Sequence, residues 1–246
     1  MITVHRLNDY KLGNALFMLA AAIGHAKKHG FEFGLTEPWR FQNYFQTPLP
    51  LVKSPHRYRL IAEKQFGYYD LYPEDDISLV GYWQSPERFM HCLETIRHYF
   101  TPVEAERAEQ FAADYELMIH IRLTDYRNFA TYHTNLETTK YYQNALSRMK
   151  DIRVITTLLV SDNIHEAVTL PPFKTCLGLQ VSESSEEFDF AMLTQAKRLI
   201  IANSSFSAFA AILNKNVERV IAPKEWFGPD GPQNWRDIYS PDWELV

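Results

Sequence analysis

The sequence predicts an α/β protein in which parallel strands alternate with helices. Short apolar runs rich in β-branched residues alternate with segments whose apolar residues recur at helical spacing. Most of these runs end in polar residues, as the strands of a doubly wound sheet do at their carboxyl ends. The chain has 246 residues, which is enough for one large domain or two small ones, each with a full core. We therefore expect a doubly wound architecture with its ligand at the carboxyl ends of the strands.

Composition excludes several classes of function. A net charge of -5 argues against broad binding to a nucleic acid backbone, so we expect no nucleic acid partner. The two cysteines, Cys92 and Cys176, fit neither a disulfide framework nor a paired metal-ligand spacing, which favours a reducing compartment. No apolar run reaches the roughly 18 to 20 residues of a membrane span, and the first residues lack the order of a signal peptide. These features predict a soluble, cytoplasmic protein with no transmembrane segment.

The first part of the chain begins with a predicted strand over residues 2–6. A helix follows, with Asn14 as its expected N-cap and Gly30 after its end, and its apolar face includes Leu16 and Ile23. Residues 31–76 are rich in Pro, Tyr and Phe without clear periodicity, so we expect irregular structure there, with an insert over about 34–76. A strand is predicted over 77–81 and a helix over 86–99.

A charged stretch over residues 104–114 is the expected boundary between two halves, 1–103 and 104–246. The second half contains a clearer series of elements. Predicted strands cover 116–121, 154–160, the surroundings of Val181, 198–202 and, as the last strand, 219–222. Predicted helices cover 137–149, 188–196 and a segment whose apolar face includes Phe206, Phe209 and Leu213.

Two strand-to-helix turns are candidate anion sites. Gly13 and Asn14 open a helix after the first strand, and the unpaired N–H groups of a first helical turn attract anions. Asn203, Ser204 and Ser205 follow a buried strand and precede an apolar helix, where small polar side chains supply donors to a phosphate or diphosphate. In both places the alternative is an ordinary helix cap with no ligand.

A third strand end carries His120, Arg122 and Asp125. Alternation places His120 and Arg122 on the same face of the strand end. The planar guanidinium of Arg122 can bind phosphate oxygens and stays protonated at any working pH, and Asp125 could orient it or accept a proton. The alternative is an Arg–Asp ion pair that only holds a loop in place.

Absent motifs narrow the function further. The chain has no G-x-G-x-x-G, no G-x-x-x-x-G-K-[ST], no G-x-S-x-G and no H-E-x-x-H, which argues against dinucleotide oxidoreductases, P-loop kinases, α/β-hydrolases and zinc peptidases. The acidic run Glu74-Asp75-Asp76 precedes a strand and does not end one, so we interpret it as a solvated turn. We predict no metal site.

Seven short blocks, in order along the chain, resemble the inverting α-1,2-fucosyltransferases of glycosyltransferase family 11. The blocks are Leu12-Gly13-Asn14, Gly81-Tyr82-Trp83-Gln84-Ser85, His120-Ile121-Arg122 with Asp125-Tyr126, Tyr141-Tyr142, Val160-Ser161-Asp162-Asn163, Ile200-Ile201-Ala202-Asn203-Ser204-Ser205-Phe206-Ser207, and Val220-Ile221-Ala222-Pro223-Lys224 with Trp226-Phe227. The resemblance implies a GT-B-like arrangement of two Rossmann-like halves with the donor cleft between them. It also implies transfer of L-fucose from GDP-L-fucose to a galactoside-type hydroxyl of a glycan acceptor, with no metal and no cofactor, in lipopolysaccharide O-antigen biosynthesis. For such an enzyme, weak peripheral attachment at the inner face of the membrane stays open.

The resemblance also implies roles for individual residues. Arg122 would contact the β-phosphate of the donor, and Asp125 would orient Arg122 or act as general base, a role for which Asp9 is the other candidate. The remaining donor-binding residues would be Gly13, Asn14, His120, Asp189, Asn203, Ser204 and Ser205, with His120 near the guanosine and Asp189 at the guanine edge.

The chain departs from the family pattern in three places. Leu123 and Thr124 stand where the family usually has Arg and Gly, Ala208 and Phe209 stand in place of two tryptophans, and Tyr10-Lys11 replaces a glycine pair. A lost Arg and a lost Gly would weaken the phosphate site or change the sugar. Two alternatives therefore remain: a transferase for another GDP-sugar, and a catalytically weakened protein that binds GDP-sugars or glycans.

Overall fold

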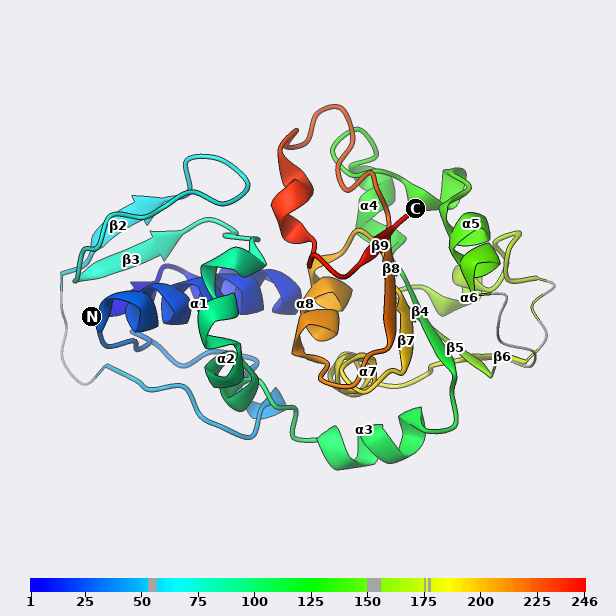
Figure 1. Cartoon of the computed structure of the whole chain (residues 1–246), viewed down its shortest axis with the longest axis horizontal. Coiled ribbons are helices and arrows are strands. Elements are labelled where there is room, and N and C mark those ends of the chain that lie inside the picture. The colour runs from blue at the N-terminus through cyan, green and yellow to red at the C-terminus, as the bar shows by residue number, and fades with distance from the viewer. Residues whose placement is uncertain (53–56, 150–155, 175, 177) are drawn as a thin grey trace. The chain divides into compact units, whose positions relative to one another are not determined.

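The computed structural model describes residues 1–52, 57–149, 156–174, 176 and 178–246, and the chain divides into two compact units (Figure 1). The first unit contains Met1–Val103 and Asn234–Ser240, and the second contains Glu104–Gln233 and Pro241–Val246. The segment Asn234–Ser240 thus departs from the expected second half, 104–246. The cause is a set of hydrogen bonds: Asn234 donates to the Phe66 carbonyl, and the Asp237 carboxylate accepts from the Tyr68 N–H at 2.6 Å.

The first unit is built on a three-stranded parallel sheet of order β1-β3-β2. The strands are β1 (Ile2–Val4), β2 (Arg59–Ala62) and β3 (Ile77–Val80), with Val4 and Ile61 both opposite Leu79. Strand β2 lies inside the region that the sequence predicts to be irregular. Single 3-10 turns cover Leu7–Asp9, Gln42–Tyr44 and, near the C-terminus, Trp235–Ile238.

Helix α1 (Leu12–His29) packs against β1 and begins earlier than expected. Its N-cap is Lys11, so the prediction that Asn14 caps this helix is wrong, and Asn14 lies in the first turn. Gly30 ends the helix as predicted, with a left-handed φ of 73°.

The helix predicted over 86–99 is interrupted. Two 3-10 turns, Pro86–Arg88 and Met90–Cys92, precede the α-helix α2 (Leu93–Tyr99). A Cβ at Gly24 of α1 would lie 2.2 Å from the Arg88 carbonyl oxygen. The backbone thus passes α1 closely at this point, where no side chain would fit between the two segments.

The second unit contains a six-stranded parallel sheet of order β6-β5-β4-β7-β8-β9. Its strands are β4 (Leu117–Ile121), β5 (Thr157–Ser161), β6 (Leu179–Val181), β7 (Arg198–Ile200), β8 (Arg219–Ala222) and β9 (Glu244–Leu245). The last strand is β9, so the prediction that the sheet ends at 219–222 is wrong. Val154 and Ile155, the start of one predicted strand, lie outside the described residues.

Helices cover both faces of this sheet, as Figure 1 shows. Helices α5 (Tyr141–Arg148) and α6 (Ile164–Ala167) lie on one face, and α3 (Ala105–Ala112), α7 (Glu186–Leu193) and α8 (Ser205–Leu213) pack together on the other. The charged stretch expected as a boundary is therefore mostly a helix. A short helix, α4 (Thr124–Asn128), follows β4, and a 3-10 turn covers Leu136–Thr138.

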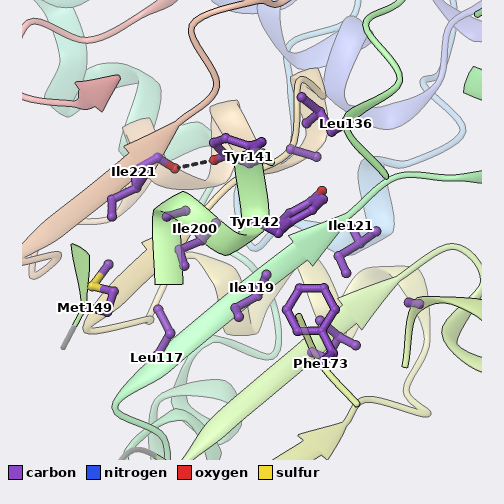
Figure 2. Close-up of a cluster of buried hydrophobic side chains, with 14 of the residues drawn as sticks. Leu117, Ile119, Ile121, Leu136, Tyr141, Tyr142, Met149, Phe173, Ile200 and Ile221 are labelled. Atoms are coloured by element: carbon purple, nitrogen blue, oxygen red, sulfur yellow. Dashed lines mark hydrogen bonds between the residues drawn. The ribbon is translucent and has the colours of Figure 1, made fainter. Parts of the chain in front are cut away.

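The core on the α5 face joins alternate residues of β4 to aromatic rings (Figure 2). Leu117, Ile119 and Ile121 pack with Tyr141 and Tyr142, all of them buried. The Tyr141 hydroxyl donates to the carbonyls of Ile201 at 2.6 Å and Ile221 at 3.0 Å, which fixes α5 over β7 and β8. The α/β fold class with parallel sheets is confirmed. In the described part of the chain, no helix is long and apolar enough to span a membrane.

Candidate active site

The strand order of the second unit places a switch point between β4 and β7. The chain runs from β4 outward to β5 and β6, and then returns to the other side of β4 to form β7. At such a point the loops after the two central strands diverge and leave a crevice at their carboxyl ends, where doubly wound proteins bind ligands. Arg122 follows β4, and Asn203 with Ser204 follows β7. Two of the three predicted strand ends thus lie at the same edge of one sheet.

Arg122 is held between two carboxylates. Its Nε and Nη2 donate to the two oxygens of Asp125 at 2.8 and 3.0 Å, and Nε lies 3.3 Å from Asp162 Oδ2. Burial acts to lower the pKa of Arg122, but the two acidic partners outweigh it and raise that pKa. The guanidinium is therefore a permanent cation. Within the described residues, its Nη1 makes no hydrogen bond.

Asp162 is a site residue that the sequence analysis places in a family block but to which it assigns no role. It follows β5 and accepts hydrogen bonds from the N–H groups of Leu123 at 2.9 Å and Thr124 at 3.1 Å, and from the Thr124 hydroxyl. Burial acts to raise its pKa, yet these donors and Arg122 lower it overall, so the carboxylate stays ionised. A polar residue directly after a parallel strand was the signal: Ile121 pairs with Ser161, so the residues that follow them meet.

Tyr126 and His133 lie beside the same strand ends of the second unit. The Tyr126 hydroxyl donates to the Asn203 carbonyl at 2.7 Å, and its ring stacks on that of His133 with centroids 4.0 Å apart. Burial lowers the pKa of His133 to about 4, so its imidazole is neutral at pH 7. The loop after β4 is thereby tied to the loop after β7. Tyr126 belongs to one of the seven blocks but was given no role from the sequence, and His133 lies outside the blocks.

Asn203 and Ser204 occupy the turn before α8. The Asn203 amide donates to the carbonyls of Thr134 at 2.9 Å and Trp226 at 2.8 Å, so this side chain joins three loops. Ser204 is the N-cap residue of α8 by position, but its side chain makes no capping hydrogen bond. The simple capping interpretation of Ser204 therefore lacks its defining contact. Ser205 is the first residue of the helix.

His120 lies beneath this site on the α8 side of the sheet. Its side chain is buried, and Nδ1 lies 2.9 Å from the Ser207 hydroxyl oxygen. Burial, with a smaller effect of Arg122, lowers the pKa of His120 to about 3. The imidazole is thus neutral and links β4 to α8.

Asp189 lies on α7 and accepts a hydrogen bond from the Ser182 hydroxyl at 2.5 Å. Burial raises its pKa to about 6, even though the Ser182 hydrogen bond acts in the opposite direction. No hydrogen bond or ion pair in the described part of the chain joins Asp189 to Arg122, so the two form separate polar groups within the second unit.

Gly13, Asn14 and Asp9 belong to the first unit. The Asn14 Oδ1 accepts from the Gln84 side chain at 2.7 Å, which links the first turn of α1 to the loop after β3. Gly13 is buried in that turn. Asp9, the second candidate base, forms an exposed ion pair with Arg6 at 2.6 Å. In the ranges that the structure describes, no group of three or more His, Cys, Asp or Glu side chains could hold a metal ion.

The sequence was compared with protein families and with known proteins. The model of the family described as glycosyl transferase family 11 matches residues 51–246. An α-1,2-colitosyltransferase of Escherichia coli is 28% identical over 163 residues, which are 61% of this chain and 56% of that protein. The match therefore spans little more than half of that relative's length.

Two groups of solved fucosyltransferase structures share the fold. The NodZ α-1,6-fucosyltransferase, from Bradyrhizobium, superposes with a TM-score of 0.54 at 13% identity, covering 91% of this chain and 94% of NodZ. POFUT1 in complex with GDP has a TM-score of 0.52 at 13% identity, covering 88% and 96%. The GT-B-like fold class predicted from the sequence is confirmed. With a family model that covers well over half of its residues, the chain belongs to glycosyltransferase family 11.

Proposed function

We propose that the protein transfers L-fucose from GDP-L-fucose to a hydroxyl of a galactoside in an α-1,2 linkage, with inversion at the anomeric carbon. The observation that carries this proposal is a partly buried arginine at the switch point of a parallel sheet, at the same sheet edge as the turn that precedes α8. The name of the E. coli relative supports the α-1,2 linkage, and the GDP and GDP-fucose of the similar structures support the donor.

In this mechanism, binding of the donor exchanges the partners of Arg122. Asp162 is fixed by two backbone N–H groups, and the side chain of Asp125 is about twice as exposed as that of Asp162, 33% against 15%. A diphosphate therefore replaces Asp125 on the guanidinium more readily than it replaces Asp162. Arg122 and the first N–H groups of α8 then stabilise the charge that develops on the leaving GDP, without a metal ion.

The same exchange assigns the general base. In this mechanism the Asp125 carboxylate, once separated from Arg122, accepts the proton of the acceptor hydroxyl. The hydroxyl oxygen bonds to the anomeric carbon, the bond from that carbon to the β-phosphate oxygen breaks, and its electron pair leaves with GDP. Asn203 and Tyr126 hold the two loops at the separation that this geometry needs.

A second candidate donor is a GDP-sugar other than GDP-fucose. The E. coli relative is named for colitosyl transfer, and Leu123 with Thr124 departs from the family pattern next to Arg122. We also place the reaction in the cytoplasm, in the assembly of lipopolysaccharide O-antigen, with weak attachment to the inner face of the membrane as part of this proposal.

A panel of nucleotides and acceptors tests the proposal. We expect GDP and GDP-fucose, but not UDP or ADP, to raise the melting temperature, and fucose to appear on the 2-hydroxyl of a β-galactoside with or without EDTA. Product linkage is measured by NMR. Stabilisation by no nucleotide contradicts GDP binding, and GDP binding with neither transfer nor donor hydrolysis supports the binding-protein alternative. Faster turnover of another GDP-sugar supports the second donor.

A further inference from the structure

The turn Gly81–Ser85 follows β3 at the carboxyl edge of the first unit's sheet, and the site described above leaves it without a role. Gly81 has φ of 129° and Trp83 has φ of 55°, both in the left-handed region. A bulky residue such as tryptophan seldom adopts that conformation, and strain of this kind is frequent where a protein holds a ligand. The backbone of this turn is thus fixed in an unfavourable shape.

A carboxylate holds the turn in that shape. Glu63 follows β2, and its two oxygens accept from the N–H of Tyr82 at 2.8 Å and of Trp83 at 3.0 Å. A Cβ at Gly81 would lie 2.5 Å from the Glu63 Cβ, so only glycine lets the turn approach this close. Burial raises the pKa of Glu63 against the effect of the two N–H groups. The turn is therefore held by a carboxylate whose charged form is disfavoured by burial.

The residues after Tyr82 anchor the turn from the other side. Trp83 is fully buried, and the Arg88 guanidinium lies 4.8 Å from its ring centroid. Gln84 is also buried and donates to Asn14 of α1 at 2.7 Å. Each residue around Tyr82 is therefore constrained, which makes the conformation of Tyr82 itself reproducible.

Tyr82, unlike the three residues that follow it, is exposed. Its side chain is 45% exposed, and its ring meets Tyr10 edge-on with centroids 5.6 Å apart. An exposed aromatic ring in a fixed position suits the apolar face of a sugar ring. A charged ligand would find no cation among the residues that form this turn.

We propose that the Gly81–Ser85 turn is the acceptor-recognition loop, in which the ring of Tyr82 contacts the acceptor sugar and Glu63 is the positioning residue that holds this ring in place. The proposal rests on the proposed glycosyl transfer, because it assigns the sugar to the acceptor. It also gives a reason for the strained backbone, since relaxing the turn would move Tyr82.

Steady-state kinetics with each substrate varied in turn test the proposal. The acceptor probe is the β-galactoside that gives the fastest turnover in the panel above. Tyr82→Ala is expected to raise the acceptor KM about fivefold or more and to leave the donor KM within about twofold. The acceptor KM of Tyr82→Phe, which keeps the ring, is expected to stay near that of the wild type. Glu63→Gln replaces one of the two carboxylate oxygens that hold the turn, and it is expected to raise the acceptor KM as Tyr82→Ala does.

Tyr72→Ala is the matched control, because Tyr72 is 83% exposed in the same unit but outside the turn. An unchanged acceptor KM in Tyr82→Ala overturns the proposal, as does a Phe variant as impaired as the Ala variant. A change of oligomeric state in Tyr82→Ala with normal acceptor KM would show instead that the ring docks a second chain. Donor hydrolysis and GDP affinity are measured in the wild type and in every variant. If the wild type shows neither, the proposed function is refuted. If Tyr82→Ala keeps both and its acceptor KM is unchanged, only the role of this loop is refuted.

Discussion

Replacement of Arg122 by alanine should lower both the rate of transfer and the free energy of unfolding, each for a different reason. The substitution removes the cation between Asp125 and Asp162, which approach the same Nε at 2.8 and 3.3 Å. Both carboxylates then remain at the carboxyl end of β4 and β5 with no positive charge between them. We expect transfer to fall by about 10²-fold or more, because the substitution removes the group that we propose to stabilise the leaving diphosphate.

The loss of stability follows from the same distances. Two oxygens so close to one nitrogen lie at most about 6 Å apart, and two unit charges at that separation repel by about 0.7 kcal/mol in water and about 3 kcal/mol at an effective dielectric constant of about 20. Since the side chains are 33% and 15% exposed, a value between these limits, about 1 to 2 kcal/mol, is expected.

The pH dependence separates repulsion from a general defect of folding. In the wild type the pKa of Asp162 is lowered, so its contribution to the free energy of unfolding is present above its ordinary value of 3.8 and is lost as pH falls through the lowered pKa. In Arg122→Ala, repulsion raises the pKa of Asp162, and protonation at low pH stabilises the folded state. The difference in unfolding free energy between the two proteins should therefore be largest at pH 7 and shrink toward pH 4, as urea unfolding at both pH values would measure.

Arg198 offers a matched control at the opposite edge of the same sheet. It begins β7, pairs with Glu116 at 2.7 Å and Glu218 at 2.6 Å, and is 21% exposed where Arg122 is 17% exposed. Arg198→Ala should lose a similar amount of stability and keep its transfer rate. Near-normal turnover in Arg122→Ala, or a stability difference that does not change with pH, would refute the reasoning.

Three further predictions follow from buried groups and backbone strain. Burial lowers the pKa of His120 to about 3, so below pH 6.5 the unfolded chain binds the proton and stability falls. His120→Gln should make the urea midpoint depend less on pH between 6.5 and 4. Burial raises the pKa of Asp189 to about 6, so above pH 4 its ionisation opposes folding. Asp189→Asn should be more stable than wild type at pH 7.5, should lose this advantage at pH 4, and should prefer GDP less strongly over ADP in a thermal-shift assay. Gly81→Ala should cost about 3 kcal/mol by urea unfolding and Gly30→Ala about 1 kcal/mol, because both have positive φ but only Gly81 lacks space for a Cβ; equal costs would contradict this.

The sequence sufficed where burial alone decides the structure. Strands β4 and β7 are mostly apolar because helices cover both faces of the sheet, and such runs can be recognised without knowledge of their partners. Strand β2 could not be found in this way, because its residues are largely exposed and its parallel partner is β3, distant in sequence. The Arg122–Asp125 pair is local, three residues apart, and was predicted as an alternative to a ligand site. Asp162 required the register of β4 against β5, which only pairing supplies.

Leu123 and Thr124 depart from the family pattern, and both take part in the structure of the strand end. From the sequence, Leu123 was interpreted as the loss of an arginine and Thr124 as the loss of a glycine that could adopt an unusual backbone conformation. Leu123 is instead buried in the core on the α5 face, and Thr124 is the first residue of the right-handed helix α4, where glycine is not required. Their N–H groups and the Thr124 hydroxyl all bond to Asp162, which in turn contacts Arg122. The substituted pair therefore fixes the carboxylate that positions the remaining arginine, and the phosphate site that we propose depends on one well-held cation.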